Sequence, residues 1–105
     1  MKRIRYISSM AKPISEDEIQ QLVELAQKHN EKKGITGMLV ATGSKFYQMI
    51  EGPERAIDAL YKRIEKDPRH SNVKLMSAES GRIDRLCPNW SMLKVDLSLA
   101  EHERL

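Results

Sequence analysis

The stretch "KFYQMIEGP", Lys45 to Pro53, alternates like a β-strand and contains one residue that such a strand does not need. Successive side chains of a strand point to opposite faces, so Phe46, Gln48 and Ile50 share one face. The residues between them are apolar or aromatic, which is typical of a strand covered on both faces. A buried primary amide requires hydrogen-bond partners, so Gln48 indicates a polar contact inside the core.

The same alternation, together with turn residues, predicts further strands on either side of this one. Gly43-Ser44 is a two-residue loop that begins with glycine, and it predicts an antiparallel hairpin. The predicted strands span residues 2–8, 35–42, 45–51, 73–79 and about 90–95.

Two helices are predicted between these strands. Ser15 can cap the first helix with Glu18 as its capping-box partner. Apolar residues then recur at helical spacing, and Gly34 can end the helix. The second helix is predicted to begin near Pro53, which suits a first turn, and to end before Pro68.

The order β-α-β-β-α-β with one additional C-terminal strand predicts a ferredoxin-like α+β fold. We expect a mixed five-stranded sheet with two helices on one face. Residues 1–95 are expected to form this one domain, and residues 96–105 a charged C-terminal tail. Because this fold serves many functions, function has to be inferred from individual sites.

The sheet face without helices is expected to be open to solvent or to a partner protein. By strand alternation, this face carries Arg3, Arg5, Ile7, Tyr47 and Met49.

Composition and charge exclude several classes of protein. The net charge is +3, and the basic residues are interleaved with acidic ones, so a nucleic-acid footprint is not expected. No apolar run reaches membrane-spanning length. A single cysteine, Cys87, suits a reducing compartment. We therefore expect a cytoplasmic protein that binds neither nucleic acid nor a membrane.

Three polar side chains are predicted to meet between the sheet and the helices. Tyr6 and Gln48 lie on inward strand faces, and Asn30 lies near the end of the first helix. Taken singly, each has a structural explanation, as a core tyrosine, a hydrogen-bonded amide and a helix-cap residue. Together with their apolar neighbours they match the composition of a small-molecule site. The ligand is expected to be flat, with an apolar body and an edge of donors and acceptors.

Catalytic and metal-binding patterns are not found in the sequence. It shows no Ser/His/Asp set, no paired carboxylates on apolar strands, no phosphate-binding glycine loop and no cluster of metal ligands among its three histidines. We expect neither an enzyme nor a metal site.

Long segments of the chain resemble the BLUF domain, a blue-light sensor that binds FAD. The matching segments follow the family order and extend from residue 2 to about residue 95. They are "RYIS", "AQKHNEKKGITGMLV", "FYQMIEGP", "LYKRIEKDPRHSNV" and "PNWSM".

The resemblance implies that the flavin ring lies between the two helices. Asn30 would bind the pyrimidine edge of the ring, and Gln48 would bridge the N5/O4 edge to the Tyr6 hydroxyl. The implied cofactor-binding residues are Tyr6, Leu22, Leu25, His29, Asn30, Phe46, Gln48, Arg63, Ile64, Arg69 and His70.

The resemblance also implies a photoactive switch and a signalling role. Blue light would drive electron and proton transfer from Tyr6 to the flavin and leave Gln48 rotated or tautomerised. The change would reach the last strand through Met92 and Trp90. The domain would be a receptor and not an enzyme. Its signal is expected to pass to a downstream signalling protein, to an effector domain outside this chain, or within a homo-oligomer.

Two other functions remain open on the same fold. A flavin-free protein-interaction module would be expected to lack Tyr6, Gln48 or Asn30, and all three are present. A hydrolase of the acylphosphatase kind would need an arginine and an asparagine around an anion-binding loop, and no such loop is found. The sequence therefore favours the photoreceptor.

Overall fold

A computed structural model of the chain describes residues 1–10, 15–42, 45–68, 70–88 and 92–96. The strands are β1 (Lys2–Met10), β2 (Thr36–Thr42), β3 (Lys45–Gly52), β4 (His70–Ser80) and β5 (Leu93–Asp96), and the helices are α1 (Glu16–Lys33) and α2 (Glu54–Lys66). The predicted hairpin loop Gly43-Ser44 and residues 97–105 of the predicted tail lie outside the described residues.

Local sequence signals fix both ends of α1. The Ser15 hydroxyl oxygen accepts a hydrogen bond from the Glu18 backbone N–H at 3.2 Å, which satisfies one free donor of the first turn. Gly34 has a φ of 69°, and its N–H donates to the Asn30 carbonyl oxygen. This left-handed conformation suits glycine because it has no Cβ. The Ser15 cap and the predicted end of the helix are confirmed, whereas the Glu18 carboxylate accepts from the Ser15 hydroxyl and not from its backbone N–H as in a capping box.

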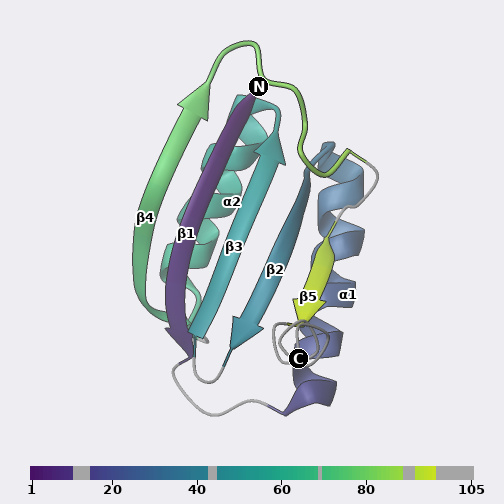
Figure 1. The fold of residues 1–105 in the computed structure, drawn as a ribbon, viewed down its shortest axis with the longest axis vertical. Helices are drawn as coiled ribbons and strands as arrows, with labels where there is room; N and C mark the ends of the chain where they lie inside the picture. The colour runs from purple at the N-terminus through teal and green to yellow at the C-terminus, as the bar shows by residue number, and fades with distance from the viewer. Residues whose placement is uncertain (11–14, 43–44, 69, 89–91, 97–105) are drawn as a thin grey trace, which may run out of the picture.

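The sheet has the strand order β4-β1-β3-β2-β5. The first four strands are antiparallel neighbours, whereas β5 pairs with β2 in parallel from Met38↔Leu93 to Ala41↔Asp96. Both helices lie against the same face of the sheet (Figure 1). The α+β class and the placement of two helices on one face of the sheet agree with the prediction.

The main core lies between the sheet and the two helices. In the register of β1 and β3, Ile4 is opposite Ile50 and Tyr6 is opposite Gln48. These four side chains are buried, as the alternation of both strands predicted. The helices contribute their own buried apolar residues, Ile19, Val23 and Ile57.

The opposite face of the sheet is less open than the sequence predicted. Arg5, Ile7 and Tyr47 are partly exposed, but Arg3 is only 6% exposed and Met49 only 2%. Met49 lies between two long side chains of neighbouring strands, those of Arg5 and Met38 in the register. Arg3 bonds to the connection that follows β4, which alternation along the strands cannot reveal.

Candidate functional site

Tyr6 and Gln48 form a buried hydrogen-bonded pair between neighbouring strands. They stand opposite each other in the β1–β3 register, so both side chains leave the sheet on the helix side. The Tyr6 hydroxyl donates to the Gln48 Oε1. Tyr6 is fully buried and Gln48 is 9% exposed. A polar contact inside the core, which the glutamine indicated, is therefore present.

The amide nitrogen of Gln48 has a partner near the last strand. Gln48 Nε2 donates to the Met92 Sδ at 3.7 Å, a weak hydrogen bond to a thioether. The Met92 backbone carbonyl accepts a hydrogen bond from Gln27 Nε2 in α1 at 3.0 Å. Met92 is 1% exposed. Its side chain is bonded to Gln48 in β3 and its backbone to Gln27 in α1.

Burial keeps the Tyr6 phenol protonated. Loss of solvent raises the pKa of Tyr6 far above its ordinary value, and the nearby Tyr61 raises it further. The two rings meet edge to face, with centroids 5.7 Å apart and planes inclined by 63°. Tyr6 is therefore a neutral hydrogen-bond donor at physiological pH, and its proton is directed at Gln48.

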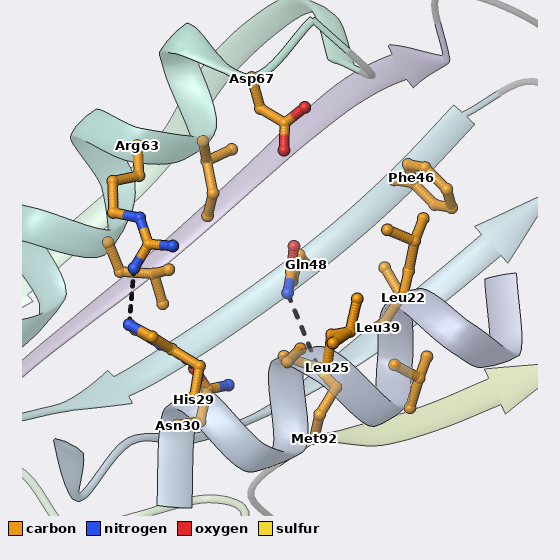
Figure 2. Close-up of a pocket in the computed structure, with 14 residues that line it drawn as sticks. Leu22, Leu25, His29, Asn30, Leu39, Phe46, Gln48, Arg63, Asp67 and Met92 are labelled. Carbon is orange, nitrogen blue, oxygen red and sulfur yellow. Dashed lines mark hydrogen bonds between the residues drawn. The ribbon is translucent and has the colours of Figure 1, made fainter. Parts of the chain in front are cut away.

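A cavity of about 220 Å³ opens beside Gln48, between the two helices. Figure 2 shows Gln48 directed from β3 into the space that α1 and α2 enclose. The predicted site residues that line the cavity are Leu22, Leu25, His29, Asn30, Phe46, Gln48, Arg63, Ile64 and Met92. Tyr6 is not among the lining residues, because it contacts Gln48 from deeper in the core.

Several lining residues were missed by the sequence analysis. They are Val23, Ala26, Leu39, Leu60 and Asp67. Leu39 is opposite Gln48 in the β2–β3 register, and Leu60 lies one helical turn before Ile64, so periodicity alone could have placed both. Asp67 follows the last turn of α2 and has no comparable signal.

The polar end of the cavity is formed by one residue pair that joins the helices. Arg63 Nη1 lies 2.7 Å from His29 Nε2, as Figure 2 shows. An arginine can only donate, so this nitrogen of His29 is the acceptor of the contact. The other ring nitrogen lies 3.4 Å from the Asn30 Oδ1, to which it donates. Donors and acceptors thus collect at one end of a largely apolar cavity.

Three of the predicted residues cannot be assigned a place in the site. Arg69 and Trp90 lie outside the described residues, and for His70 the structure gives the backbone at the start of β4. Among the described residues, no group of three or more His, Cys, Asp or Glu side chains is arranged to hold a metal ion. None of the described helices is long and apolar enough to cross a membrane.

Comparison with known proteins relates this chain to blue-light sensors. A family model described as "Sensors of blue-light using FAD" matches residues 1–93. The blue light- and temperature-regulated antirepressor BluF of Escherichia coli is 40% identical over 55 residues, 52% of this chain and 14% of that protein. The photoactivated adenylate cyclase subunit beta of Euglena gracilis is 37% identical over 70 residues, 67% of this chain and 8% of that protein. The chain thus spans a small part of the curated relatives it matches.

Solved structures with the same architecture include sensors with and without long additional regions. A bacterial light-regulated adenylyl cyclase matches with a TM-score of 0.89 and 37% identity, over 92% of this chain and 28% of that one. The dark-state structure of BlrB, a BLUF protein, matches with a TM-score of 0.87 and 32% identity, over 96% of this chain and 76% of that one.

Proposed function

The chain belongs to the BLUF family of blue-light sensors, and on this premise we propose that it binds FAD in the cavity between α1 and α2 and signals through Gln48. The observation that carries this proposal is the series of contacts from Tyr6 through Gln48 to Met92 at the cavity wall. It joins a buried phenol, an amide and the segment that leads into β5.

The lining of the cavity suits a flavin in both its apolar and its polar parts. Leu22, Leu25, Phe46 and Ile64 offer apolar surface to the faces of a planar ring. Leu25 is 61% exposed although it lines the cavity, so a ligand there would cover apolar surface that water now contacts. This is the composition expected of a site for a flat aromatic cofactor.

Polar groups on α1 and α2 would orient the cofactor. Asn30 would bind the pyrimidine edge, and His29 the neighbouring carbonyl edge. Arg63 provides a cation at the same end of the cavity, where it would support a carbonyl or phosphate oxygen. Arg69 and His70 are proposed to flank the cofactor as well.

When bound, the flavin would supply the absorption of blue light and would accept an electron and a proton from Tyr6. Tyr6 holds this proton on its hydroxyl and shares it with the Gln48 Oε1. Because the site is shielded from water, a change in the orientation of the amide alters hydrogen-bond energies more than it would at the surface.

Rotation of the Gln48 amide would break its contact with Met92. In the present orientation Nε2 donates to the Met92 Sδ. After a half-turn an oxygen would face that sulfur, and both atoms are acceptors. The Met92 side chain would then lose its hydrogen bond to Gln48. We propose that this loss carries the signal to β5, with Trp90 acting in the same step.

The proposed output is a signal and not a chemical product. Relatives named as an antirepressor and as adenylate cyclases show that BLUF domains occur in proteins with different outputs. For this chain we propose a downstream signalling protein, an effector domain or a homo-oligomer as the receiver, in the cytoplasm.

The proposal is tested by the absorption spectrum of the purified protein incubated with FAD. A bound flavin should give a yellow protein whose absorption shifts reversibly to the red under blue light. Gln48→Leu should retain flavin and lose the shift. The matched control is Gln21→Leu, which makes the same change at an exposed position of α1 outside the cavity.

Two outcomes contradict the proposal. A protein that does not take up FAD would instead support the flavin-free interaction module. A photocycle that Gln48→Leu leaves unchanged would refute the role of Gln48 while leaving flavin binding intact.

A further inference from the structure

Glu51 is a buried acid that the proposed photochemistry does not use. It lies on β3 three residues after Gln48, so its side chain leaves the opposite face of the sheet. Its carboxylate is fully buried. A buried charge persists only when it is paired and hydrogen-bonded, so the partners of Glu51 indicate what the residue does.

Both carboxylate oxygens of Glu51 bind the connection between β4 and β5. Oε1 accepts from the Leu86 backbone N–H at 3.0 Å, and Oε2 accepts from the Cys87 backbone N–H at 2.9 Å. Oε1 also accepts from Arg3 Nε at 3.1 Å, and Oε2 from the Thr36 hydroxyl at 3.3 Å. Strands β1, β2 and β3 thus all contribute to this cluster.

Two arginines strengthen the same attachment. Arg3 Nη2 donates to the Asp84 carbonyl oxygen at 2.5 Å. Arg85 extends from the connection back to the sheet, where it donates to the Gly34 carbonyl oxygen at 2.7 Å and to the Thr36 hydroxyl at 2.8 Å. Residues 84–87 have no regular secondary structure. Charge-assisted hydrogen bonds hold them to the sheet, some from sheet side chains to the connection and others from Arg85 to the sheet.

The attached segment lies shortly before Met92 in the chain. Met92 contacts Gln48 on the helix side of β3, whereas the Glu51 carboxylate binds the amides of Leu86 and Cys87 on the other side. One strand therefore holds the connection at two places, through one bond that the proposed switch breaks and through a cluster that it does not touch.

We propose that Glu51 is a positioning residue that fixes residues 84–87 to β3, so that release of Met92 by Gln48 displaces β5 and leaves the preceding segment in place. This inference rests on the proposed function for its light-dependent part. The anchoring itself is a property of the dark protein and can be measured without light.

The test is hydrogen–deuterium exchange of the flavin-loaded protein in darkness and under blue light, resolved to the amides of Leu86 and Cys87. In the wild-type protein these two amides should be protected from exchange in darkness and in light. The light-induced increase in exchange rate should be confined to Met92 and β5. In Glu51→Gln, dark protection of the two amides should fall about tenfold or more, because an amide offers one acceptor oxygen where the carboxylate offers two. The light-induced increase should then extend into residues 84–87.

Glu79→Gln is the matched control for this change. Glu79 also binds Arg3, at 3.2 Å, and it binds Arg5 at 2.9 Å, but it is exposed. This variant removes an acid from the same arginine and should leave the exchange pattern as in wild type. If Glu51→Gln does not fold, Arg85→Ala removes the second attachment with Glu51 intact, and it should also extend the light-induced exchange into residues 84–87.

Three results would overturn the inference. The first is a light-induced increase at Leu86 and Cys87 in the wild-type protein. The second is unchanged dark protection of these amides in Glu51→Gln. The third is a light response confined to β5 in the folded anchor variants. A protein without any spectral shift refutes the proposed function instead, and the dark exchange still decides whether Glu51 anchors the segment.

Discussion

Tyr6 and Gln48 face each other across the β1–β3 ladder, and the phenol hydroxyl donates a hydrogen bond to the amide oxygen inside the core. The amide nitrogen in turn donates to the Met92 sulfur. A single orientation of the Gln48 amide therefore satisfies both Tyr6 and Met92. This dependence is what a side-chain switch requires, because a change on one side cannot be absorbed without a change on the other.

Replacement of Tyr6 by Phe should preserve the fold and abolish the light response. The variant removes the donor to the Gln48 Oε1 and leaves a buried acceptor unpaired, which costs about 1–3 kcal/mol of the free energy of unfolding. Flavin should still bind, and the light-induced shift should be absent. Tyr47→Phe is the control, because Tyr47 lies on the other face of β3. Denaturant unfolding and the difference spectrum measure the two effects, and a wild-type photocycle in Tyr6→Phe would refute the assigned role.

The buried phenol should make the protein less stable at high pH. Burial raises the pKa of Tyr6 in the folded state, whereas in the unfolded chain the phenol titrates near about pH 10. The unfolded state therefore releases this proton first, so the contribution of Tyr6 to stability is present below about pH 10 and is lost as the pH rises beyond it. The free energy of unfolding should fall more steeply with alkaline pH in the wild type than in Tyr6→Phe. If the free energy of unfolding depends on pH equally in the two proteins, the phenol is not shielded from water in the folded state.

The sequence predicts which face each strand residue occupies much better than what covers that face. Alternation placed Tyr6 and Gln48 inward, and Gly34 ended α1 as expected, because both depend on residues close in the chain. The same alternation assigned Arg3 and Met49 to an open surface, and they are buried. Arg3 bonds to the Asp84 carbonyl oxygen, in a segment without periodicity that comes from a distant part of the chain.

The candidate site shows the same division. The segments that resemble the family contain several residues that line the cavity, among them Phe46 and Arg63. The position of Tyr6 behind Gln48, rather than in the lining, depends on three-dimensional depth that a sequence pattern does not contain. Glu51 belongs to the quoted stretch, yet its contact with the connection after β4 could not be predicted, because it is made to the backbone amides of Leu86 and Cys87, and every residue except proline carries such an amide.

Met92→Leu should alter the switch while leaving the core intact. Exchange of Met for Leu conserves volume and costs less than about 1.5 kcal/mol of stability, but it removes the sulfur that accepts from Gln48 Nε2. The dark arrangement then loses a hydrogen bond, so the illuminated form should return to it more slowly. Met38→Leu, at a half-buried position of β2 outside the cavity, is the control. Dark recovery after a light pulse measures the effect, and recovery as fast as in wild type would argue against a contribution of Met92.

Leu25 should contribute to flavin affinity without contributing to stability. Its side chain is 61% exposed while lining the cavity, so Leu25→Ala should change the free energy of unfolding of the flavin-free protein by no more than about 0.5 kcal/mol. A ligand that covers this side chain loses apolar contact in the variant, and its affinity should fall about tenfold. Leu75→Ala is the control, because Leu75 is 50% exposed on β4 and does not line the cavity. Titration with FAD measures the difference, and equal affinities in the two variants would place the flavin elsewhere.

The contribution of Glu51 to stability should disappear in acid. Burial alone would raise the pKa of Glu51, but hydrogen bonds from the Cys87 and Leu86 amides and from Arg3 outweigh it and hold the pKa below its ordinary value. A carboxyl whose pKa is lowered on folding contributes stability above the pKa of the unfolded chain, about 4.3, and this stability is lost as the pH falls through the folded-state value.

At neutral pH, Glu51→Gln should therefore lower the free energy of unfolding by about 3–5 kcal/mol, since it leaves Arg3 without its buried partner. As the pH falls, the wild-type carboxyl becomes protonated and comes to resemble the glutamine. The difference between the two proteins should shrink toward zero, while Glu79→Gln, at an exposed position, should follow the wild type throughout. Denaturant unfolding at a series of pH values measures these curves. A difference that stays constant from neutral to acid pH would mean that the packing of Glu51, and not its charge, holds the connection to the sheet.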